Sequence, residues 1–486
     1  MTELRPVILV NGFLLLTLGL AMAVPVGFDL ANQNEDWKIF AVAAAFTIFV
    51  GGALTIAARG EQQAGQTALS VRQAFLLIVS VWISITAFAA LPLSFAGIGL
   101  SYTDAFFEAM SGITTTGATV MTGLDTTPPG ILIWRALLQW LGGIGIVVMA
   151  IAVLPMLQVG GMQLFKMESS DNSEKILPRA TQIASGLAWL YMGMTAICFV
   201  GYWFSGMSAF DAIAHSMTTV STGGFSTHDA SFGHFGFAHA EVMATLFMIV
   251  GSLPFTLIIV AVTGKPLRLW RDTQVRTFLM IVMITTVVLV LWRWQYQDVL
   301  TLDTLREAAF NGVAVISGTG YASADYNSWG PFAQLFLFCC MLIGGCAGSA
   351  SCGIKVFRFQ ILYEMVKGEI LRIRHPHAVF IPRYNGRKIG DDVTDSVMSF
   401  FFLFVAALGL IILALSATGL DLMTAASAAA AALANVGPGL GDIVGPTGTY
   451  QSLPDIAKWT LSAAMLLGRL ELLVVLVLFT PKLWNS

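Results

Sequence analysis

Long apolar stretches, separated by short polar segments, follow one another along this chain of 486 residues. A helix that crosses a bilayer needs about 20 consecutive, mostly apolar residues. We expect ten such helices, at residues 7–27, 37–58, 73–95, 131–157, 181–205, 239–263, 276–295, 331–353, 396–418 and 455–481. The first stretch could instead be a signal peptide that ends near Ala21-Met22-Ala23, but its apolar run is longer than usual for one. The pattern predicts an all-α integral membrane protein.

Composition supports this class and excludes several others. Hydrophobic residues make up 56% of the chain and charged residues 11%, whereas a soluble protein has about 45–50% and about 25%. The net charge of −3 gives no case for nucleic-acid binding. The five cysteines lie in apolar or glycine-rich surroundings, without the spacing of a metal cluster. No P-loop, catalytic triad or redox motif occurs, so we expect neither an enzyme nor a resident cofactor.

The distribution of Lys and Arg predicts the orientation in the membrane. Cytoplasmic segments of membrane proteins carry an excess of these residues. If the N-terminus is cytoplasmic, 19 of the 25 Lys and Arg residues fall on that side of the ten expected spans. We therefore expect a multi-pass protein of the cytoplasmic (inner) membrane with both termini in the cytoplasm.

Four segments on the outer side differ from ordinary loops. Each has 10–15 moderately apolar residues, too few to span a bilayer, followed by a turn of small residues. Apolar runs of this length indicate re-entrant segments. The four lie at residues 104–119, 211–226, 306–323 and 421–439, and their central glycines are Gly117, Gly223, Gly320 and Gly437. The quasi-regular spacing predicts a fourfold internal repeat.

The repeat divides the chain into five expected parts. The first two spans precede it as an extra helix pair. Each repeat then consists of a span, a half-helix with its turn, and a second span. The boundaries are 1–69 for the helix pair, and 70–179, 180–274, 275–394 and 395–486 for pore repeats one to four.

Irregular backbone at membrane depth must be buried in protein or line a water-filled cavity. Four such turns can converge on one axis, where a dehydrated cation would satisfy their carbonyl groups as in a selectivity filter. The C-terminal dipole of each half-helix also favours a cation there. Acidic residues near the half-helix starts are expected N-caps or outer-mouth charges: Asp104, Asp211, Asp303 and Asp421. A single turn of this kind would be read as helix packing, but four at similar spacing favour a filter.

The four turns carry a resemblance to a known family. TTTGA (114–118), STGGF (221–225), SGTGY (317–321) and NVGPG (435–439) resemble the Trk/Ktr/HKT superfamily of potassium transporters. The extra N-terminal helix pair resembles its TrkH/TrkG branch. The resemblance implies four repeats of helix, pore helix and helix around one pore. It implies that K⁺ is coordinated by Thr115, Thr116, Gly117, Thr222, Gly223, Thr319, Gly320, Val436 and Gly437. In the family, glycine at all four central positions, which are Gly117, Gly223, Gly320 and Gly437 here, goes with potassium over sodium.

A gate is expected below the filter. Residues 344–353 are ten consecutive small residues with four glycines, and each glycine costs a helix about 1 kcal/mol relative to alanine. We expect this run to unwind within the span; close helix packing is the alternative. The resemblance implies an intramembrane gating loop here, which includes Gly344, Gly345, Cys346, Ala347, Gly348 and Ser349. Arg469 lies within the last span and is expected to face the pore. Lys355 and Arg358 are expected to be ordinary cytoplasmic-end charges.

The longest polar segment on the cytoplasmic side, residues 354–395, predicts partners. Asn385-Gly386 between short alternating runs is a strong hairpin signal. The segment is either a solvated connection that attracts anionic membrane lipid or a docking site for a regulator. The resemblance implies a cytosolic nucleotide-binding ring of the TrkA type and a homodimer.

We therefore expect potassium uptake through a channel-like filter with an intramembrane gate. The alternative is a symporter that couples K⁺ to H⁺ or Na⁺. Such a transporter needs a carboxylate relay within the membrane, for which Glu241 and Glu471 are the best residues. A purely structural subunit would not explain four re-entrant turns.

Overall fold

The computed structural model describes residues 4–59, 70–152, 180–236, 238–298, 300–377 and 380–481. Within these ranges the regular elements are helices, apart from one two-stranded sheet. Seven helical segments are long and apolar enough to cross a membrane. They are α1 (Arg5–Ala21) with α2 (Ala23–Ala31), α3 (Trp37–Ala58), α4 (Val71–Phe95), α6 (Pro129–Ala152), α9 (Ala180–Phe204), α14 (Thr273–Gln297) and α18 (Asp391–Ser416). The prediction of an all-α membrane protein is confirmed.

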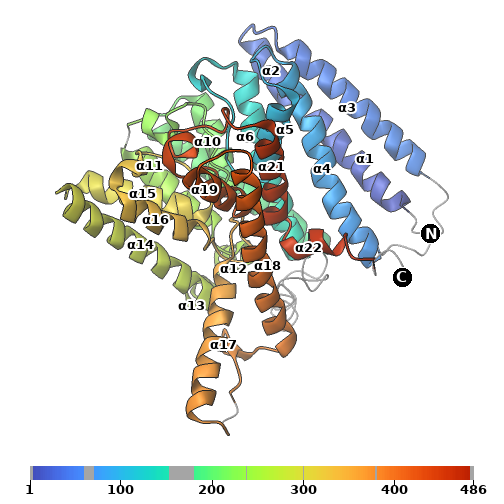
Figure 1. Ribbon diagram of the computed structural model, residues 1–486. Coiled ribbons are helices and arrows are strands. Elements are labelled where there is room, and N and C mark those ends of the chain that lie inside the picture. The colour runs from blue at the N-terminus through green and yellow to red at the C-terminus, as the bar shows by residue number, and fades with distance from the viewer. Residues whose placement is uncertain are drawn as a thin grey trace.

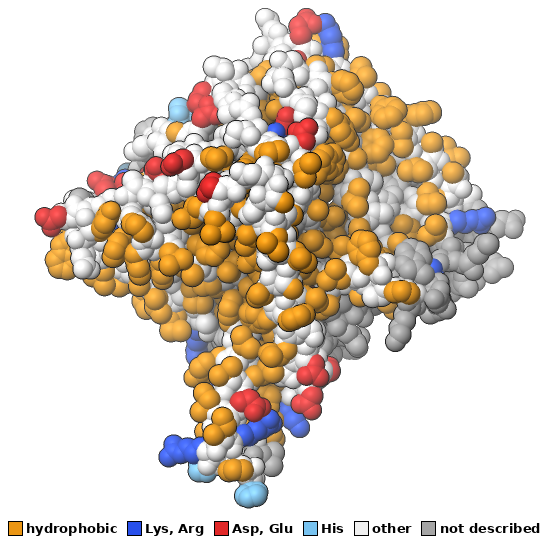
Figure 2. Space-filling view, in the orientation of Figure 1, with side chains coloured by type: hydrophobic (Ala, Val, Ile, Leu, Met, Phe, Trp, Pro, Cys, Tyr) orange, Lys and Arg blue, Asp and Glu red, His pale blue; other side chains and the backbone are white. Residues whose placement is uncertain are grey.

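Apolar side chains form a broad band around the visible face, between charged upper and lower edges (Figure 2). In the most apolar stretches of α14 and α18 only 22% of residues are buried within the protein. Phe402, Val405, Leu410 and Leu413 of α18 are all largely exposed. Such a surface would be unfavourable in water but matches the hydrocarbon of a bilayer.

Four short helices lie inside this shell, in the upper half of the view in Figure 1. They are α5 (Tyr102–Ile113), α10 (Ala209–Val220), α15 (Leu302–Ser317) and α19 (Leu422–Leu433). Their first turns are capped by side chains that accept a backbone hydrogen bond: Ser101, Ser208, Thr301 and Asp421. Of the four expected N-cap aspartates only Asp421 is the cap; the others lie in the first helical turn, because a Ser or Thr precedes them.

Three of the expected spans are broken. Residues 239–263 form α11 (Ala238–Gly251) and α12 (Phe255–Val262). The chain bends by 103° between these two helices, next to Pro254. Residues 331–353 form only α16 (Pro331–Met341) before the glycine-rich run. Residues 455–481 form α21 (Asp455–Arg469) and α22 (Leu472–Val477). The last part of the expected span 131–157 lies outside the described residues.

The predicted hairpin is present on the segment that projects from the bottom of the molecule in Figure 1. Strands β1 (Arg383–Tyr384) and β2 (Arg387–Lys388) pair antiparallel. Asn385 and Gly386 between them have φ angles of 49° and 79°, as a type I′ turn requires. The hairpin packs against α17 (Val356–Arg374) and is tied to the start of α14, because Asn385 Nδ2 donates to Asp272 Oδ2 over 2.9 Å.

The remaining elements are short connections. Helix α13 (Leu267–Arg271) joins α12 to α14, and α20 (Gly441–Val444) follows the fourth turn. Single 3₁₀ turns occur at Leu124–Thr126, Ser231–His234 and Tyr326–Trp329. The N-terminal pair α1 and α3 packs closely at one edge of the molecule, at the right in Figure 1.

Candidate functional site

The four turns that follow the short helices share one backbone conformation. Each has a residue with positive φ, then a residue without positive φ, then a glycine with positive φ. The pairs of positive φ angles are Thr115 (52°) and Gly117 (85°), Thr222 (51°) and Gly224 (80°), Gly318 (73°) and Gly320 (75°), and Asn435 (52°) and Gly437 (103°). Glycine adopts such angles without strain, which accounts for the glycine at the third position of every turn. At the first position only the third turn has a glycine, and Thr115, Thr222 and Asn435 adopt the left-handed conformation at a cost in strain.

This conformation corrects the alignment of the second turn by one residue. Gly224, not Gly223, has the positive φ that matches Gly117, Gly320 and Gly437. Gly223 occupies the position of Thr116 instead. The sequence STGGF contains two adjacent glycines, so the letters alone did not identify the equivalent one.

The four turns form a closed ring. A Cβ atom added to any of the four positive-φ glycines would lie closer than 3.0 Å to a carbonyl oxygen of the next turn. These contacts run from Gly117 to Gly223, from Gly224 to Thr319, from Gly320 to Val436, and from Gly437 back to Thr116. Each turn therefore touches its neighbour in chain order, and the fourth touches the first.

Hydrogen bonds tie each turn to its own short helix. The backbone N–H groups of Thr116, Gly223, Thr319 and Val436 donate back to carbonyls of their own short helices, over 2.8–2.9 Å. With the amides turned toward the helices, the carbonyls of the same residues are directed toward the neighbouring turn. One of them, Gly223 O, also accepts from Gln139 Nε2 over 2.6 Å.

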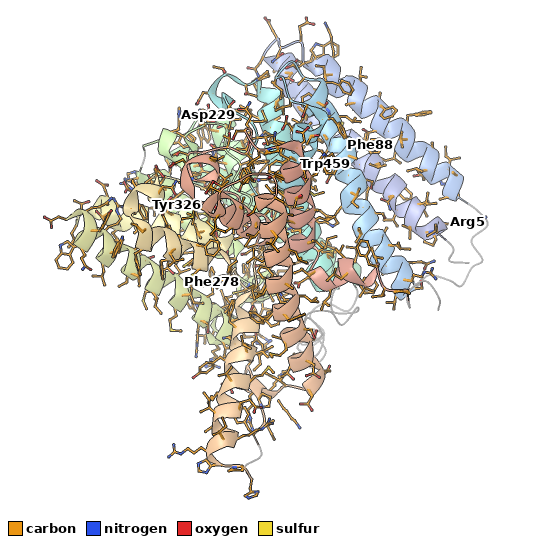
Figure 3. The ribbon with its side chains drawn as sticks, viewed as in Figure 1. Arg5, Phe88, Asp229, Phe278, Tyr326 and Trp459 are labelled. Carbon is orange, nitrogen blue, oxygen red and sulfur yellow. The ribbon has the colours of Figure 1, made fainter. Side chains whose placement is uncertain are left out.

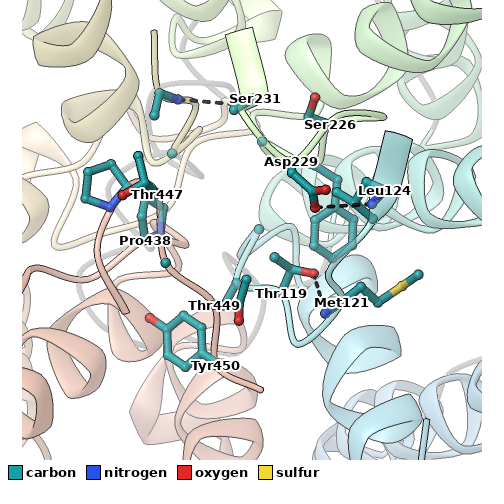
Figure 4. A pocket seen from close by; sticks show the side chains of 18 of the residues that line it. Thr119, Met121, Leu124, Ser226, Asp229, Ser231, Pro438, Thr447, Thr449 and Tyr450 are labelled. Atoms are coloured by element: carbon teal, nitrogen blue, oxygen red, sulfur yellow. Dashed lines mark hydrogen bonds between the residues drawn. The ribbon is translucent and has the colours of Figure 1, made fainter. Parts of the chain in front are cut away.

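A cavity of about 220 Å³ lies against this ring. Residues of all four turns line it, among them Gly117, Gly224, Gly320 and Pro438. Figure 4 shows the four chain segments converging around it, with Thr119 and Met121 on one side and Thr447, Thr449 and Tyr450 on the other. Tyr450 donates from its hydroxyl to Gly437 O over 2.8 Å and so braces the fourth turn. The cavity is large enough for a cation with part of its water shell.

The predicted unwinding of residues 344–353 is confirmed, because no helix covers them between α16 and α17. The loop is held by backbone groups freed at the break between α11 and α12. Cys346 N donates to Ser252 O over 2.9 Å, and Phe255 N donates to Gly348 O over 3.0 Å. Ser351 Oγ donates to Ser317 O, at the end of α15, over 2.5 Å. The loop thus lies against the base of the third turn.

Arg469, at the end of α21, is buried against the same loop. Its Nη1 donates to Ala350 O over 3.3 Å and contacts Cys352 Sγ. Its Nε and Nη2 atoms have no hydrogen-bond partner among the described residues. The structure therefore places Arg469 against the second half of the glycine-rich run, at Ala350 and Cys352, which are not among the six expected gate residues.

A known protein family matches most of this chain. The family model for TrkH, described as a cation transport protein, matches residues 36–486. The chain belongs to the TrkH family. The Trk system potassium uptake protein TrkI of Halomonas elongata is 42% identical over 99% of this chain and 97% of its own length. TrkH of Escherichia coli K12, also named a Trk system potassium uptake protein, is 36% identical over 99% of both chains.

A solved structure matches the whole fold of this TrkH-family chain. The crystal structure of the potassium transporter TrkH from Vibrio parahaemolyticus superposes with a TM-score of 0.91 at 34% identity. The match covers 99% of this chain and 100% of that one. Together with the apolar spans, it identifies the TrkH-family chain as a polytopic membrane protein.

One buried ion pair beside the first two turns of this TrkH-family chain was missed by the sequence reasoning. Arg135, expected to be a packing or interfacial group, and Glu108 are both buried and paired, with Nε 2.8 Å from Oε1. Glu108 Oε2 also accepts from Val120 N over 2.9 Å, just after the first turn. Arg135 Nη1 donates to Ser226 O over 2.9 Å, just after the second turn. The available signal was a single arginine within an apolar span.

Lys355 and Arg358 correct another expectation. They are buried rather than ordinary end charges. Both pair with Glu471: Lys355 Nζ lies 3.4 Å from Oε1, and Arg358 Nη2 contacts Oε2. Glu471 has a φ of 63° at the break between α21 and α22. This cluster joins the end of the glycine-rich loop to the last span of the TrkH-family chain.

Proposed function

We propose that the chain mediates potassium uptake across the cytoplasmic membrane through a channel-like selectivity filter. The observation that carries the proposal is the closed ring in which each positive-φ glycine touches a carbonyl of the next turn. The names of the relatives, potassium uptake proteins, support K⁺ as the transported ion. The proposal involves no catalytic step and no resident cofactor.

In this proposal the filter is built by four repeats at residues 70–179, 180–274, 275–394 and 395–486. Residues 1–69 are an accessory helix pair. K⁺ leaves its water shell and binds carbonyl oxygens of Thr116, Gly223, Thr319 and Val436, with Thr115, Gly117, Thr222, Gly320 and Gly437 shaping the turns. Ring carbonyls replace the hydration of the ion. An inside-negative potential favours entry by ~2.3 kcal/mol per charge per 100 mV.

The gate of the proposed pore is the loop 344–353 together with Arg469. The loop lies against the third turn through Ser351 and is held by the break between α11 and α12. The guanidinium group of Arg469 opposes a cation at low dielectric. Flux then requires the loop and this side chain to move aside.

We also propose that both termini are cytoplasmic and that α17 with its hairpin faces the cytoplasm. Lys166, Lys175, Arg179 and Lys482, four of the charges behind this orientation, lie outside the described residues. The projecting α17 would then meet anionic lipid or a nucleotide-binding ring of the TrkA type. A homodimer is proposed on the resemblance alone.

Symport of K⁺ with H⁺ or Na⁺ is the second reading of the same fold. Its best carboxylates are already engaged, because Glu241 Oε2 lies 3.1 Å from Arg306 Nε and Glu471 is paired with two cations. Glu241→Gln separates the two readings. Flux that persists in this variant supports the pore, and loss of proton-coupled flux with a retained fold supports symport.

The experiment that tests the proposal is cation flux into proteoliposomes that hold this chain alone, driven by a set potential. Uptake of K⁺ and Rb⁺ should exceed that of Na⁺, and Gly320→Ser should remove the preference. Gly193→Ser is the matched control, because a Cβ there meets nothing within 4 Å. Equal uptake of all three ions by the unmodified chain would contradict the filter.

A further inference from the structure

Two histidines in the loop after the second turn stack on each other. The rings of His228 and His234 have centroids 3.5 Å apart and an interplanar angle of 4°. Both face an aspartate from the loop after the first turn. Asp125 Oδ1 lies 2.5 Å from His228 Nδ1 and 3.7 Å from His234 Nδ1. Two separate loops therefore direct three potential metal ligands at one point.

We propose that Asp125, His228 and His234 bind a transition-metal dication such as Zn²⁺ beside the outer end of the pore. One ligand atom from each residue lies within 4.8 Å of the other two. Tetrahedral Zn²⁺, with bonds of about 2.0–2.1 Å, places its ligand atoms about 3.3 Å apart. The two imidazoles would have to turn out of their parallel stack to direct both nitrogens at one ion. Imidazole with one carboxylate suits Zn²⁺, Cu²⁺ or Ni²⁺ better than Ca²⁺ or Mg²⁺.

The surroundings fit a cation. His228 Nε2 lies 3.4 Å from Asp211 Oδ1, which also accepts from Thr227 Oγ1 over 2.7 Å. Asp125 and Asp211 therefore face the two ring nitrogens of His228, and a carboxylate on the nitrogen away from the metal is the usual partner of a ligating histidine.

The ligands are pre-positioned yet reachable from water. Phe235 packs edge-on against both imidazoles, at 5.3 Å and 5.4 Å, and so holds the pair in place. The side chains of Asp125 and His234 are 46% and 45% exposed, whereas that of His228 is 17% exposed. Three protein ligands leave a fourth tetrahedral position for water. An ion can therefore enter without unfolding the loops.

The location connects the metal site to the filter. His228 and Asp229 line the cavity above the ring. Asp229 lies at the upper surface in Figure 3, and its Oδ1 accepts from Leu124 N over 3.1 Å, the dashed contact in Figure 4. A bound dication would tie together the loops that follow the first two turns and place positive charge where K⁺ gathers. Inhibition of uptake by Zn²⁺ follows, a consequence that rests on the proposed function.

Binding is tested first, by calorimetric titration of the full chain in detergent with Zn²⁺. One ion per chain should bind, with affinity at least tenfold weaker in His234→Ala and in Asp125→Asn. His239→Ala is the matched control, an exposed histidine that follows the same loop and should leave binding unchanged. Absent saturable binding, or equal affinity in all four proteins, would overturn the site.

Transport then tests the consequence independently. In proteoliposomes, Zn²⁺ should slow K⁺ uptake of the unmodified chain and of His239→Ala, and chelation by EDTA should restore it. His234→Ala should lose this Zn²⁺ sensitivity. Zn²⁺ that binds without slowing uptake would overturn the link to the pore. Absence of K⁺ uptake even without Zn²⁺ would count against the proposed function, while the titration alone decides the metal site.

Discussion

Single glycines set the geometry of the proposed filter. Each of Gly117, Gly224, Gly320 and Gly437 combines a positive φ with a carbonyl contact that leaves no room for a side chain. Two independent constraints thus meet at each position. Glycines elsewhere, such as Gly193, meet neither and serve as controls.

Gly117→Ser should therefore reduce the preference for K⁺ over Na⁺. The added Cβ displaces the Gly223 carbonyl from the ring, and loss of ~1.4 kcal/mol of selective binding corresponds to about tenfold in preference. Flux of K⁺ and Na⁺ in proteoliposomes measures it, with Gly193→Ser in parallel. An unchanged ratio in folded Gly117→Ser would remove this turn from the filter.

The ion pair behind the first two turns should dominate local stability. Glu108→Gln leaves the buried guanidinium of Arg135 without a counter-charge, which costs about 3–5 kcal/mol. Thermal unfolding in detergent should show a clearly lowered melting temperature. Glu369→Gln breaks the exposed pair with Arg372 and should cost about 0–1 kcal/mol. Equal shifts in both variants would mean that the buried pair has no special role.

Prediction from single residues succeeded where only one structural role explains the residue type. Small residues and glycines identified the four turns, and a glycine-rich run identified a non-helical segment. It failed where two neighbours are chemically alike, as with Gly223 and Gly224. It also failed for Lys355 and Arg358, because burial depends on Glu471, more than 100 residues away in the sequence.

At the scale of elements, hydropathy predicted the continuous spans well and the broken ones poorly. A hydropathy average does not register a bend inside an apolar run. Pro254 was the only local signal for the break between α11 and α12, and Glu471 the only one for the break after α21. Both breaks are stabilised by partners on other elements, which the sequence does not reveal.

The contact between the loop 344–353 and Arg469 of α21 predicts how K⁺ flux through the proposed gate depends on the charge of this side chain. Arg469→Ala should raise K⁺ flux of the chain alone several-fold, because it removes a buried positive charge and the contact with Ala350. Arg469→Lys keeps the charge and is the control, with flux close to that of the unmodified chain. Flux in Arg469→Ala that stays at the unmodified level would exclude Arg469 from the gate.

At the scale of the whole molecule, one chain supplies all four walls of the proposed pore. The ring closes between the fourth and the first turn, over 320 residues of sequence. Oligomerisation is therefore not needed to build the ring itself. The architecture that forms this ring matches the solved TrkH structure over 99% of this chain.

The central claim is that this ring forms a passive, potassium-selective pore. The most direct measurement is the zero-current potential of membranes that contain the chain alone, under separate K⁺, Na⁺ and pH gradients. The account predicts that this potential follows the K⁺ gradient at its full Nernst value and ignores the other two. A potential that moves with the pH or Na⁺ gradient would contradict a passive selective pore and establish coupled or unselective transport.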